Sequence, residues 1–139
     1  AVMIYHPMVP VLFAPDVRER AIGEFEGRPV RSYLEAQAAS AQSRLEYRPP
    51  GGESFVELRA RTDLFLRRLL SNYRGRTVLI CTHGGPIRTL LAAILKMPLE
   101  EMIDQEIDNA SLTLVEYGHD GEVQRCTINS TQHLWAQAA

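Results

Sequence analysis

The sequence predicts an α/β sandwich with a mixed sheet, and three features of the chain lead to this fold class. A continuous apolar run over residues 77–82, without polar alternation, indicates a strand buried on both faces. The segments before and after it repeat apolar side chains at helical spacing. Two further strand patterns near the end of the chain are joined by a Gly-His-Asp-Gly turn. Helix, strand and helix followed by a hairpin are typical of a sheet covered by helices.

The first part of the chain is predicted to form a short strand, a loop and a polar helix. Residues 9–13 are β-branched and aromatic, which favours a strand. Residues 16–27 mix charges with Gly23 and Gly27, so we expect a loop with special backbone requirements. Residues 31–43 are rich in Ala, Gln and Glu, which predicts a polar helix.

The next helix is marked by a start signal. A Pro-Pro-Gly-Gly break at residues 49–52 precedes Ser54, and Glu57 follows three positions later. This is a capping box, in which the hydroxyl and the carboxylate satisfy free amides at the helix start. The helix is predicted to run to about Asn72, with Gly75 as its stop. Its apolar residues fall near one face: Phe55, Leu58, Phe65, Leu66, Leu69 and Tyr73.

A third helix should follow the buried strand. His83 and a glycine pair lead into Pro86, which stands at the expected first helical position. Apolar residues at helical spacing from Ile87 to Leu95 predict that this helix packs inward, and Pro98 ends it. Residues 112–117 and 123–129 are the strands of the hairpin, and residues 118–121 are its turn.

Composition limits the classes of function. The 139 residues suffice for one domain, 1–139, with a real core, and a net charge of −2 gives no sign of nucleic-acid or membrane binding. No apolar run approaches the roughly 20 residues that span a bilayer. The four histidines are scattered and no cysteine pair has ligand spacing, which argues against a metal site. Cys81 and Cys126 are expected to be buried free thiols in a reducing, cytoplasmic setting, although a disulfide stays open.

The chemistry is predicted at the loop around His83. A buried strand, two glycines and a helix are typical of an anion site, because backbone amides approach the ligand closely and the helix start carries partial positive charge. His83 lies at the carboxyl end of the strand, where open α/β sheets bind their ligands. Its imidazole can hydrogen-bond or charge-pair with a phosphate. The alternative is a structural histidine beside a tight turn.

Four segments resemble the histidine phosphatase superfamily, in its phosphoglycerate-mutase-like branch. Thr-His-Gly-Gly-Pro-Ile-Arg at residues 82–88 resembles the second histidine motif of the family. Residues 17–27, with Val-Arg-Glu first and Phe-Glu-Gly last, are similar to its leucine-x-glutamate segment. Pro-Gly-Gly-Glu-Ser at 50–54 and Asp-Asn-Ala-Ser-Leu at 108–112 match two further segments in order. The resemblance implies a three-layer α/β/α sandwich with a mixed, mostly parallel sheet.

The resemblance also implies roles for individual residues. His83 would bind the phosphoryl oxygens and stabilise transition-state charge, and the Gly84 amide would hold the same group. Glu19 would protonate the leaving alcohol and then activate water. Glu53 either touches substrate or braces the pocket, and Arg88 either touches substrate or faces solvent. The implied activity is hydrolysis of phosphate monoesters of small metabolites through phosphohistidine, with no cofactor and no metal.

The family's phospho-accepting histidine has no counterpart in these residues. It belongs to an Arg-His-Gly motif, and no such triplet occurs in the sequence. His6, the only histidine before His83, stands between Tyr5 and Pro7. We therefore expect an N-terminally incomplete domain, with the acceptor histidine and its strand upstream of Ala1, that is inactive alone. An incomplete sheet also favours self-association, so a homo-oligomer is an open expectation.

Two alternatives to a phosphatase are carried forward. The first is a phosphoglycerate-type mutase, whose branch usually has a His-Gly-Asn loop and a longer insert after the Glu-Gly segment. Gly85 and a short insert favour a phosphatase, of the kind that acts on ribazole phosphate or fructose bisphosphate. The second is an inactive, truncated relative that serves as a binding module for a partner or a phosphoryl ligand.

Overall fold

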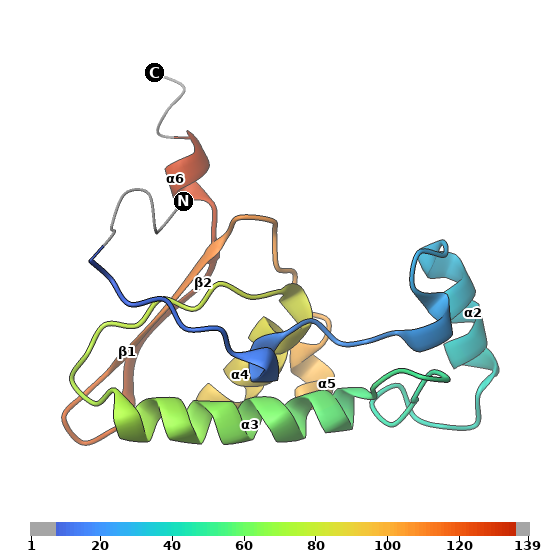
Figure 1. The fold of residues 1–139 in the computed structure, drawn as a ribbon, viewed down its shortest axis with the longest axis horizontal. Coiled ribbons are helices and arrows are strands. Elements are labelled where there is room, and N and C mark those ends of the chain that lie inside the picture. Colours follow the sequence, from blue (N-terminus) through green and yellow to red (C-terminus); the bar gives the residue numbers. More distant parts are fainter. Residues whose placement is uncertain (1–7, 136–139) are drawn as a thin grey trace.

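In the computed structural model, which describes residues 8–135, the elements gather around one long helix (Figure 1). This helix is α3, Phe55–Asn72. It contacts α4, Gly84–Ile94, and the short 3₁₀ helix η1, Pro15–Val17. The remaining elements are η2 (Gly23–Phe25), α2 (Val30–Ala39), α5 (Leu99–Met102), β1 (Leu112–Tyr117), β2 (Val123–Ser130) and α6 (Gln132–Trp135). Helix α2 lies beyond one end of α3, away from the hairpin (Figure 1).

The predicted capping box of α3 is confirmed. The Ser54 hydroxyl accepts a hydrogen bond from the Glu57 amide at 3.1 Å, and the Glu57 carboxylate accepts one from the Ser54 amide at 2.8 Å. Leu58 and Thr62 form the fully buried part of the helix face. The Thr62 and Thr89 hydroxyls lie 2.9 Å apart in a buried hydrogen bond, which ties α3 to α4. The pair therefore fixes the position of α4 along α3.

The capping box makes stability depend on pH in a testable way. The pKa of Glu57 is lowered from its usual 4.5, chiefly by the hydrogen bond from the Ser54 backbone. Because the folded protein favours the ionised carboxylate, Glu57 stabilises the fold at any pH above its pKa in the unfolded chain. This stabilisation is lost as the pH falls through the lowered pKa of the folded protein. We expect Glu57→Gln to lower the midpoint of thermal unfolding at about pH 7 and to have a smaller effect at about pH 3. A constant difference between the two proteins would contradict this role.

Helix α4 forms as predicted but begins earlier than expected. Its first residue is Gly84 and its N-cap is His83, so Pro86 is the third residue of the helix rather than the first. The inward face is apolar and buried, and Leu91 and Ala92 join the core that α5 completes. The helix ends at Ile94 with Leu95 as its C-cap, before Pro98, which was predicted to end it and is instead the N-cap of α5.

The hairpin is confirmed, whereas a mostly parallel sheet is not seen among the described residues. Strands β1 and β2 pair antiparallel, with Val115 opposite Cys126, and together they form a two-stranded sheet. The turn closes through a hydrogen bond from the Gly121 amide to the Gly118 carbonyl at 3.0 Å. The α/β class is therefore correct, and the part of the sheet that lies in residues 8–135 is small.

Two predicted strands, residues 9–13 and 77–82, are extended but form no ladder within the described part of the chain. Leu79 is 63% exposed and Phe13 is 94% exposed, so neither run is buried. An apolar run indicates that a segment prefers to be covered, but a strand also requires a partner, and pairing is not encoded locally. Both cysteines are free thiols as expected, but neither is fully buried as predicted, since Cys81 is exposed and Cys126 is partly buried.

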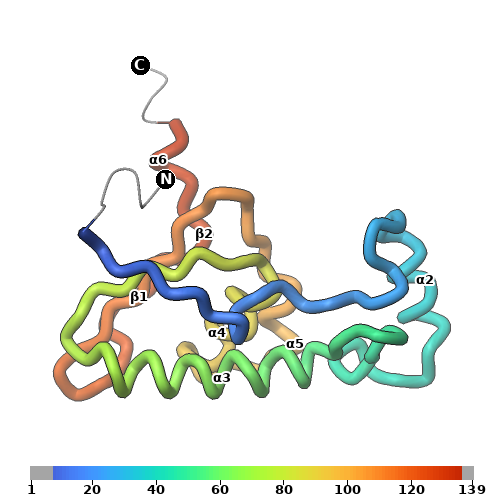
Figure 2. The backbone as a smooth tube through the Cα atoms, in the orientation of Figure 1, coloured from blue at the N-terminus to red at the C-terminus, as the bar shows by residue number. Residues whose placement is uncertain are grey.

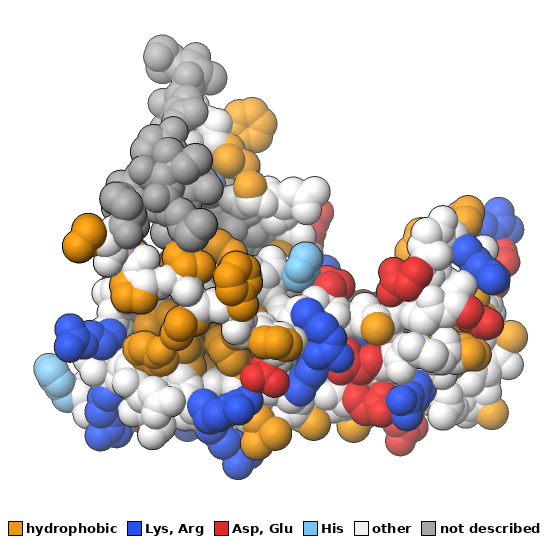
Figure 3. Space-filling view, viewed as in Figure 1, with side chains coloured by type: hydrophobic (Ala, Val, Ile, Leu, Met, Phe, Trp, Pro, Cys, Tyr) orange, Lys and Arg blue, Asp and Glu red, His pale blue; other side chains and the backbone are white. Residues whose placement is uncertain are grey.

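Exposed apolar side chains gather where these extended segments run past the hairpin. In the view of Figure 2, the chain that leads into η1 crosses residues 77–82. The Thr82 hydroxyl donates a hydrogen bond to the Val17 carbonyl, which connects the two segments. Apolar side chains are concentrated on this face of the molecule (Figure 3). The exposed apolar residues of these elements are Met8, Val9, Val11, Leu12, Phe13, Val78, Leu79, Leu112 and Leu114. An apolar surface of this kind is typical of a face that is covered by other polypeptide.

Candidate functional site

The start of α4 is the centre of the candidate site. His83 is the N-cap residue, with extended backbone and an exposed side chain that makes no capping hydrogen bond. Its imidazole is therefore not engaged in holding the helix. The first amides of a helix have no partner within it and point toward whatever lies at its start. The predicted combination of a histidine and a helix N-terminus is thus present.

The structure brings Glu19 to the same helix start. Glu19 lies in the segment between η1 and η2, and its Oε2 accepts a hydrogen bond from the Gly85 amide at 3.3 Å. Its Oε1 accepts one from the amide of Arg20 at 2.8 Å. The side chain of Glu19 is thus held by two backbone amides, one of which belongs to the first turn of α4. Glu19, more than sixty positions before His83 in the sequence, therefore contacts the first turn of the helix that His83 caps.

Gly85 is a site residue that sequence reasoning did not single out for this contact. A Cβ atom at this position would lie 2.2 Å from Glu19 Oε1 and 3.3 Å from Leu58 Cδ2. Any other residue would therefore push the carboxylate away from the helix. The sequence shows Gly85 as the second glycine of a Gly-Gly pair, but it does not show that the side chain of Glu19 packs against this position.

The segment that follows Glu19, residues 21–24, packs closely against residues 50–53. The Glu24 amide donates to the Pro50 carbonyl at 3.1 Å, and the Glu53 amide donates to the Ala21 carbonyl at 2.9 Å. Gly23 has a φ of +58°, and a Cβ there would lie 2.0 Å from the Pro50 carbonyl oxygen. Only glycine allows this approach, which confirms the predicted special backbone requirement of the loop.

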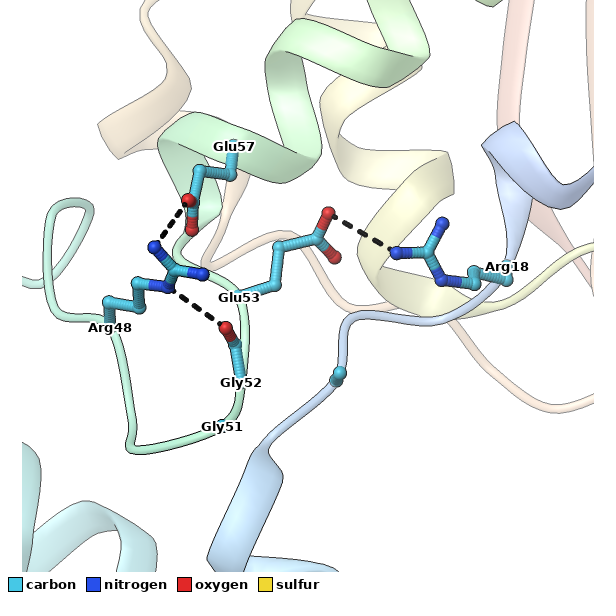
Figure 4. Close-up of a pocket in the computed structure, with 7 residues that line it drawn as sticks. Arg18, Arg48, Gly51, Gly52, Glu53 and Glu57 are labelled. Atoms are coloured by element: carbon cyan, nitrogen blue, oxygen red, sulfur yellow. Dashed lines mark hydrogen bonds and ion pairs between the residues drawn. The ribbon is translucent and has the colours of Figure 1, made fainter.

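Glu53 is engaged by Arg61 rather than free for a ligand. The two carboxylate oxygens accept from Arg61 Nε and Nη2 at 2.6 and 2.7 Å, and both side chains are little exposed. Arg18 adds a longer contact at 3.8 Å (Figure 4). Of the two roles that the sequence left open for Glu53, this geometry favours bracing. The same close-up shows Arg48 held by the carboxylate of Glu57 at 3.2 Å.

An open pocket of about 280 Å³ lies beside the start of α4. Arg88 lines it and is anchored by a hydrogen bond from its Nε to the Gln105 carbonyl at 2.7 Å. A Cβ on Gly84 would lie 2.9 Å from Arg88 Nη1, so the guanidinium sits close to the first residue of the helix. The lining residues are Glu19, Arg20, Ile22, Glu26, Phe55, Gly85 and Arg88. Arg88, the fifth residue of α4, therefore faces the pocket from the second turn of the helix.

Arg20 is a second pocket residue that the sequence did not identify. Its guanidinium lies 4.3 Å from the ring centroid of Phe55 and 5.1 Å from that of Tyr33, and it donates to the Tyr33 hydroxyl at 2.9 Å. It also donates to the Glu53 carbonyl at 2.9 Å. Stacked and hydrogen-bonded in this way, Arg20 is a fixed positive charge on the wall of the pocket.

The other predicted features of the chain lie away from this site. His119 is exposed in the hairpin turn and His133 is exposed on α6. Within residues 8–135, no three His, Cys, Asp or Glu side chains are grouped so that they could hold a metal ion. No helix in the described range has the length and apolar character needed to cross a membrane. His6 lies outside the described residues.

Comparison with known proteins adds an independent line of evidence. Residues 3–129 match the family model of the histidine phosphatase superfamily, branch 1. A bifunctional protein of Mycobacterium tuberculosis is 31% identical over 132 residues, covering 89% of this chain and 35% of that protein. A metal-independent phosphoserine phosphatase of Arabidopsis thaliana is 34% identical over 90 residues, covering 60% of this chain and 37% of its own length.

A phosphoglycerate mutase and two solved structures are also similar. The 2,3-bisphosphoglycerate-dependent mutase of Gloeobacter violaceus is 30% identical over 133 residues, covering 88% of this chain and 61% of the mutase. The chain thus spans between 35% and 61% of these curated relatives. YhfR of Bacillus stearothermophilus superposes with a TM-score of 0.78 at 23% identity, covering 96% of this chain and 68% of its own. The α-ribazole phosphatase of Shigella flexneri superposes with a TM-score of 0.77 at 22% sequence identity, covering 93% of this chain and 65% of the phosphatase. Both share the fold.

Proposed function

Because the chain belongs to the histidine phosphatase superfamily, we propose that the protein hydrolyses phosphate monoesters of small metabolites through a phosphohistidine intermediate. The observation that carries this proposal is the contact of the Glu19 carboxylate with the Gly85 amide, in the first turn of the helix that His83 caps. The acceptor histidine is proposed to come from polypeptide outside these 139 residues. Relatives with phosphatase names are part of the same family.

The proposed reaction has two steps, each with a defined path for the proton. In the first, the acceptor imidazole nitrogen attacks phosphorus, the P–O bond to the alcohol breaks, and the protonated Glu19 carboxyl gives its proton to the departing oxygen. In the second, water attacks phosphorus and gives its proton to the Glu19 carboxylate, while the P–N bond breaks and phosphate leaves. His83 and the amide of Gly84 would stabilise the phosphoryl oxygens in both steps.

The pocket supports a small, anionic substrate. It is open, and Arg20 and Arg88 place positive charge on its walls beside the carboxylates of Glu19 and Glu26. Arg20 is held by aromatic rings and hydrogen bonds, so it presents its charge without further ordering. In this proposal Arg88 contacts the substrate, while Glu53 acts by bracing the loop.

A direct experiment uses the protein expressed from its complete coding sequence. We expect it to release inorganic phosphate from phosphorylated small metabolites in the presence of EDTA, and residues 1–139 alone to release none. A mutase would instead move the phosphoryl group between hydroxyls of the substrate with little free phosphate, an outcome that the similarity to a phosphoglycerate mutase makes worth measuring. Binding of phosphate esters without turnover would identify a binding module and would contradict the proposal.

Substitution of Gly85 tests the geometry of the site. In Gly85→Ala the new methyl group would occupy the place of Glu19 Oε1, at 2.2 Å, and the flexible carboxylate would move aside. We expect kcat/KM for an alkyl phosphate to fall by about 100-fold, because misplacing a catalytic group by about 1 Å has effects of this size. The midpoint of thermal unfolding should change little, because the methyl group displaces the end of the Glu19 side chain and not the backbone. In a Glu19→Gln background the same substitution should add almost nothing.

A further inference from the structure

We propose that Arg61 is the positioning residue that holds Glu19 in place for proton transfer, an inference that rests on the function proposed above. Arg61 projects from α3 toward the segment that carries Glu19, and its side chain is only 13% exposed. Its Nη1 donates to the Asp16 carbonyl at 2.6 Å, and its Nη2 donates to the Glu19 carbonyl at 3.3 Å. One guanidinium therefore grips the main chain of this segment at both ends.

The guanidinium is itself fixed by Glu53. Nε and Nη2 of Arg61 bind the two carboxylate oxygens at 2.6 and 2.7 Å, which is the paired geometry that sets the plane of an arginine head group. Glu53 directly precedes Ser54, the N-cap of α3. The anchor of Arg61 therefore directly precedes the N-cap of the helix that carries Arg61 itself.

Arg61 and its neighbour Thr62 act on the two sides of the Glu19 contact. Arg61 holds the main chain of Glu19, while the hydroxyl of Thr62 bonds that of Thr89 on α4 at 2.9 Å. Helix α4 carries the Gly85 amide that Glu19 contacts at 3.3 Å. One turn of α3 thus sets the separation between the carboxylate and the helix start. Because a Cβ at Gly85 would already collide with the carboxylate, this separation has little tolerance.

A purely structural ion pair and a positioning residue predict different dependence on the leaving group. An alkoxide needs a proton from the general acid in order to leave, whereas p-nitrophenolate leaves without one. Loss of Glu19 placement should therefore slow the first step with an alkyl phosphate and spare it with p-nitrophenyl phosphate. Partial unfolding would reduce both rates in the same proportion. The parameter to compare is kcat/KM, which reports the steps through departure of the alcohol.

The experiment compares Arg61→Lys, Arg61→Met and Glu19→Gln in the complete protein, with Arg59→Met as the matched control. Arg59 lies on the same helix, and its guanidinium pairs at 2.6 Å with Asp63, one turn further along α3. We expect Arg61→Lys to lower kcat/KM for an alkyl phosphate by about 100-fold and for p-nitrophenyl phosphate by less than about 3-fold. Arg59→Met should leave both values unchanged.

The outcomes separate the two proposals. If Glu19→Gln shows the selective loss and neither Arg61 variant does, Arg61 is not a positioning residue, although the proposed function stands. If Glu19→Gln shows no selective loss, the role of Glu19 in the proposed function fails. Should the Arg61 variants fold poorly, Glu53→Gln provides a second test, because it loosens the same guanidinium while leaving Arg61 in place. It should give the same selectivity, and equal losses with both substrates would overturn the inference.

Discussion

Replacing His83 with alanine is expected to lower kcat/KM for phosphate ester hydrolysis by about 1000-fold in the complete protein. The imidazole is exposed at the start of α4 and makes no capping hydrogen bond, so its removal takes no support from the helix. What is lost is a donor to phosphoryl oxygens that carry more charge in the transition state. The measurement is steady-state release of inorganic phosphate, and the thermal midpoint should stay close to that of the parent protein.

His119→Ala is the matched control for this substitution. His119 is also exposed, but it lies in the hairpin turn. Its removal should leave kcat/KM unchanged. His83→Asn should recover part of the lost activity, because the amide keeps a hydrogen-bond donor in the same region. If His83→Ala retained activity within a few-fold of the parent, the role given to this residue would be wrong.

Replacing Glu19 with glutamine is expected to lower kcat for hydrolysis by about 1000-fold. Glutamine keeps the shape of the side chain and a carbonyl oxygen that accepts from the Gly85 amide, so the local fold should be preserved. It cannot give or take the proton. The first step then fails with alkyl phosphates, and the hydrolysis of the intermediate slows with every substrate, because water is no longer activated.

Glu26→Gln separates this effect from a simple change of pocket charge. Glu26 lines the same pocket, but its carboxylate accepts a hydrogen bond from the Ile22 amide at 2.9 Å, whereas that of Glu19 accepts one from the start of α4. We expect kcat to change by less than about 3-fold. Equal losses in the Glu19 and Glu26 variants would show that negative charge, and not proton transfer at Glu19, is what the reaction needs.

Local signals in the sequence predicted the helical half of the fold well. The capping box at Ser54 and Glu57 placed the start of α3 correctly, because both partners of the motif lie within one turn. The hairpin was also placed correctly, since a four-residue turn closes it. The polar helix α2 ends at Ala39 rather than at residue 43, and helix ends without a strong stop signal are the least defined.

The strand predictions for residues 9–13 and 77–82 failed for a physical reason, whereas the two strands of the hairpin were predicted correctly. Residues 77–82 are apolar enough for a buried strand, yet burial and pairing depend on other segments that come alongside. In residues 8–135 the run is extended and largely exposed, with Leu79 at 63%. The apolar composition of the run therefore indicates that another segment should cover it, but the run itself does not specify which segment that is.

The roles of the candidate site residues stay predictions, and the sequence did not reveal the contacts between these residues. His83 and Glu19 were identified by their motifs, and the structure brings Glu19 to the helix start that His83 caps. Arg61 was missed because its partners, Asp16 and Glu19, lie more than forty positions away in the sequence, and no local rule joins them. Glu53 was left between two roles because only the fold shows that a guanidinium occupies both of its oxygens.

Trapping of the covalent intermediate tests the central claim most directly. The complete protein carrying Glu19→Gln should react with p-nitrophenyl phosphate in a burst of about one p-nitrophenolate per protein molecule, followed by slow turnover. Mass spectrometry should then find an acid-labile phosphoryl group on a histidine, and His83→Ala in the same background should weaken the burst. Absence of a burst, or a phosphoryl group on serine or aspartate, would contradict a phosphohistidine mechanism built around the start of α4.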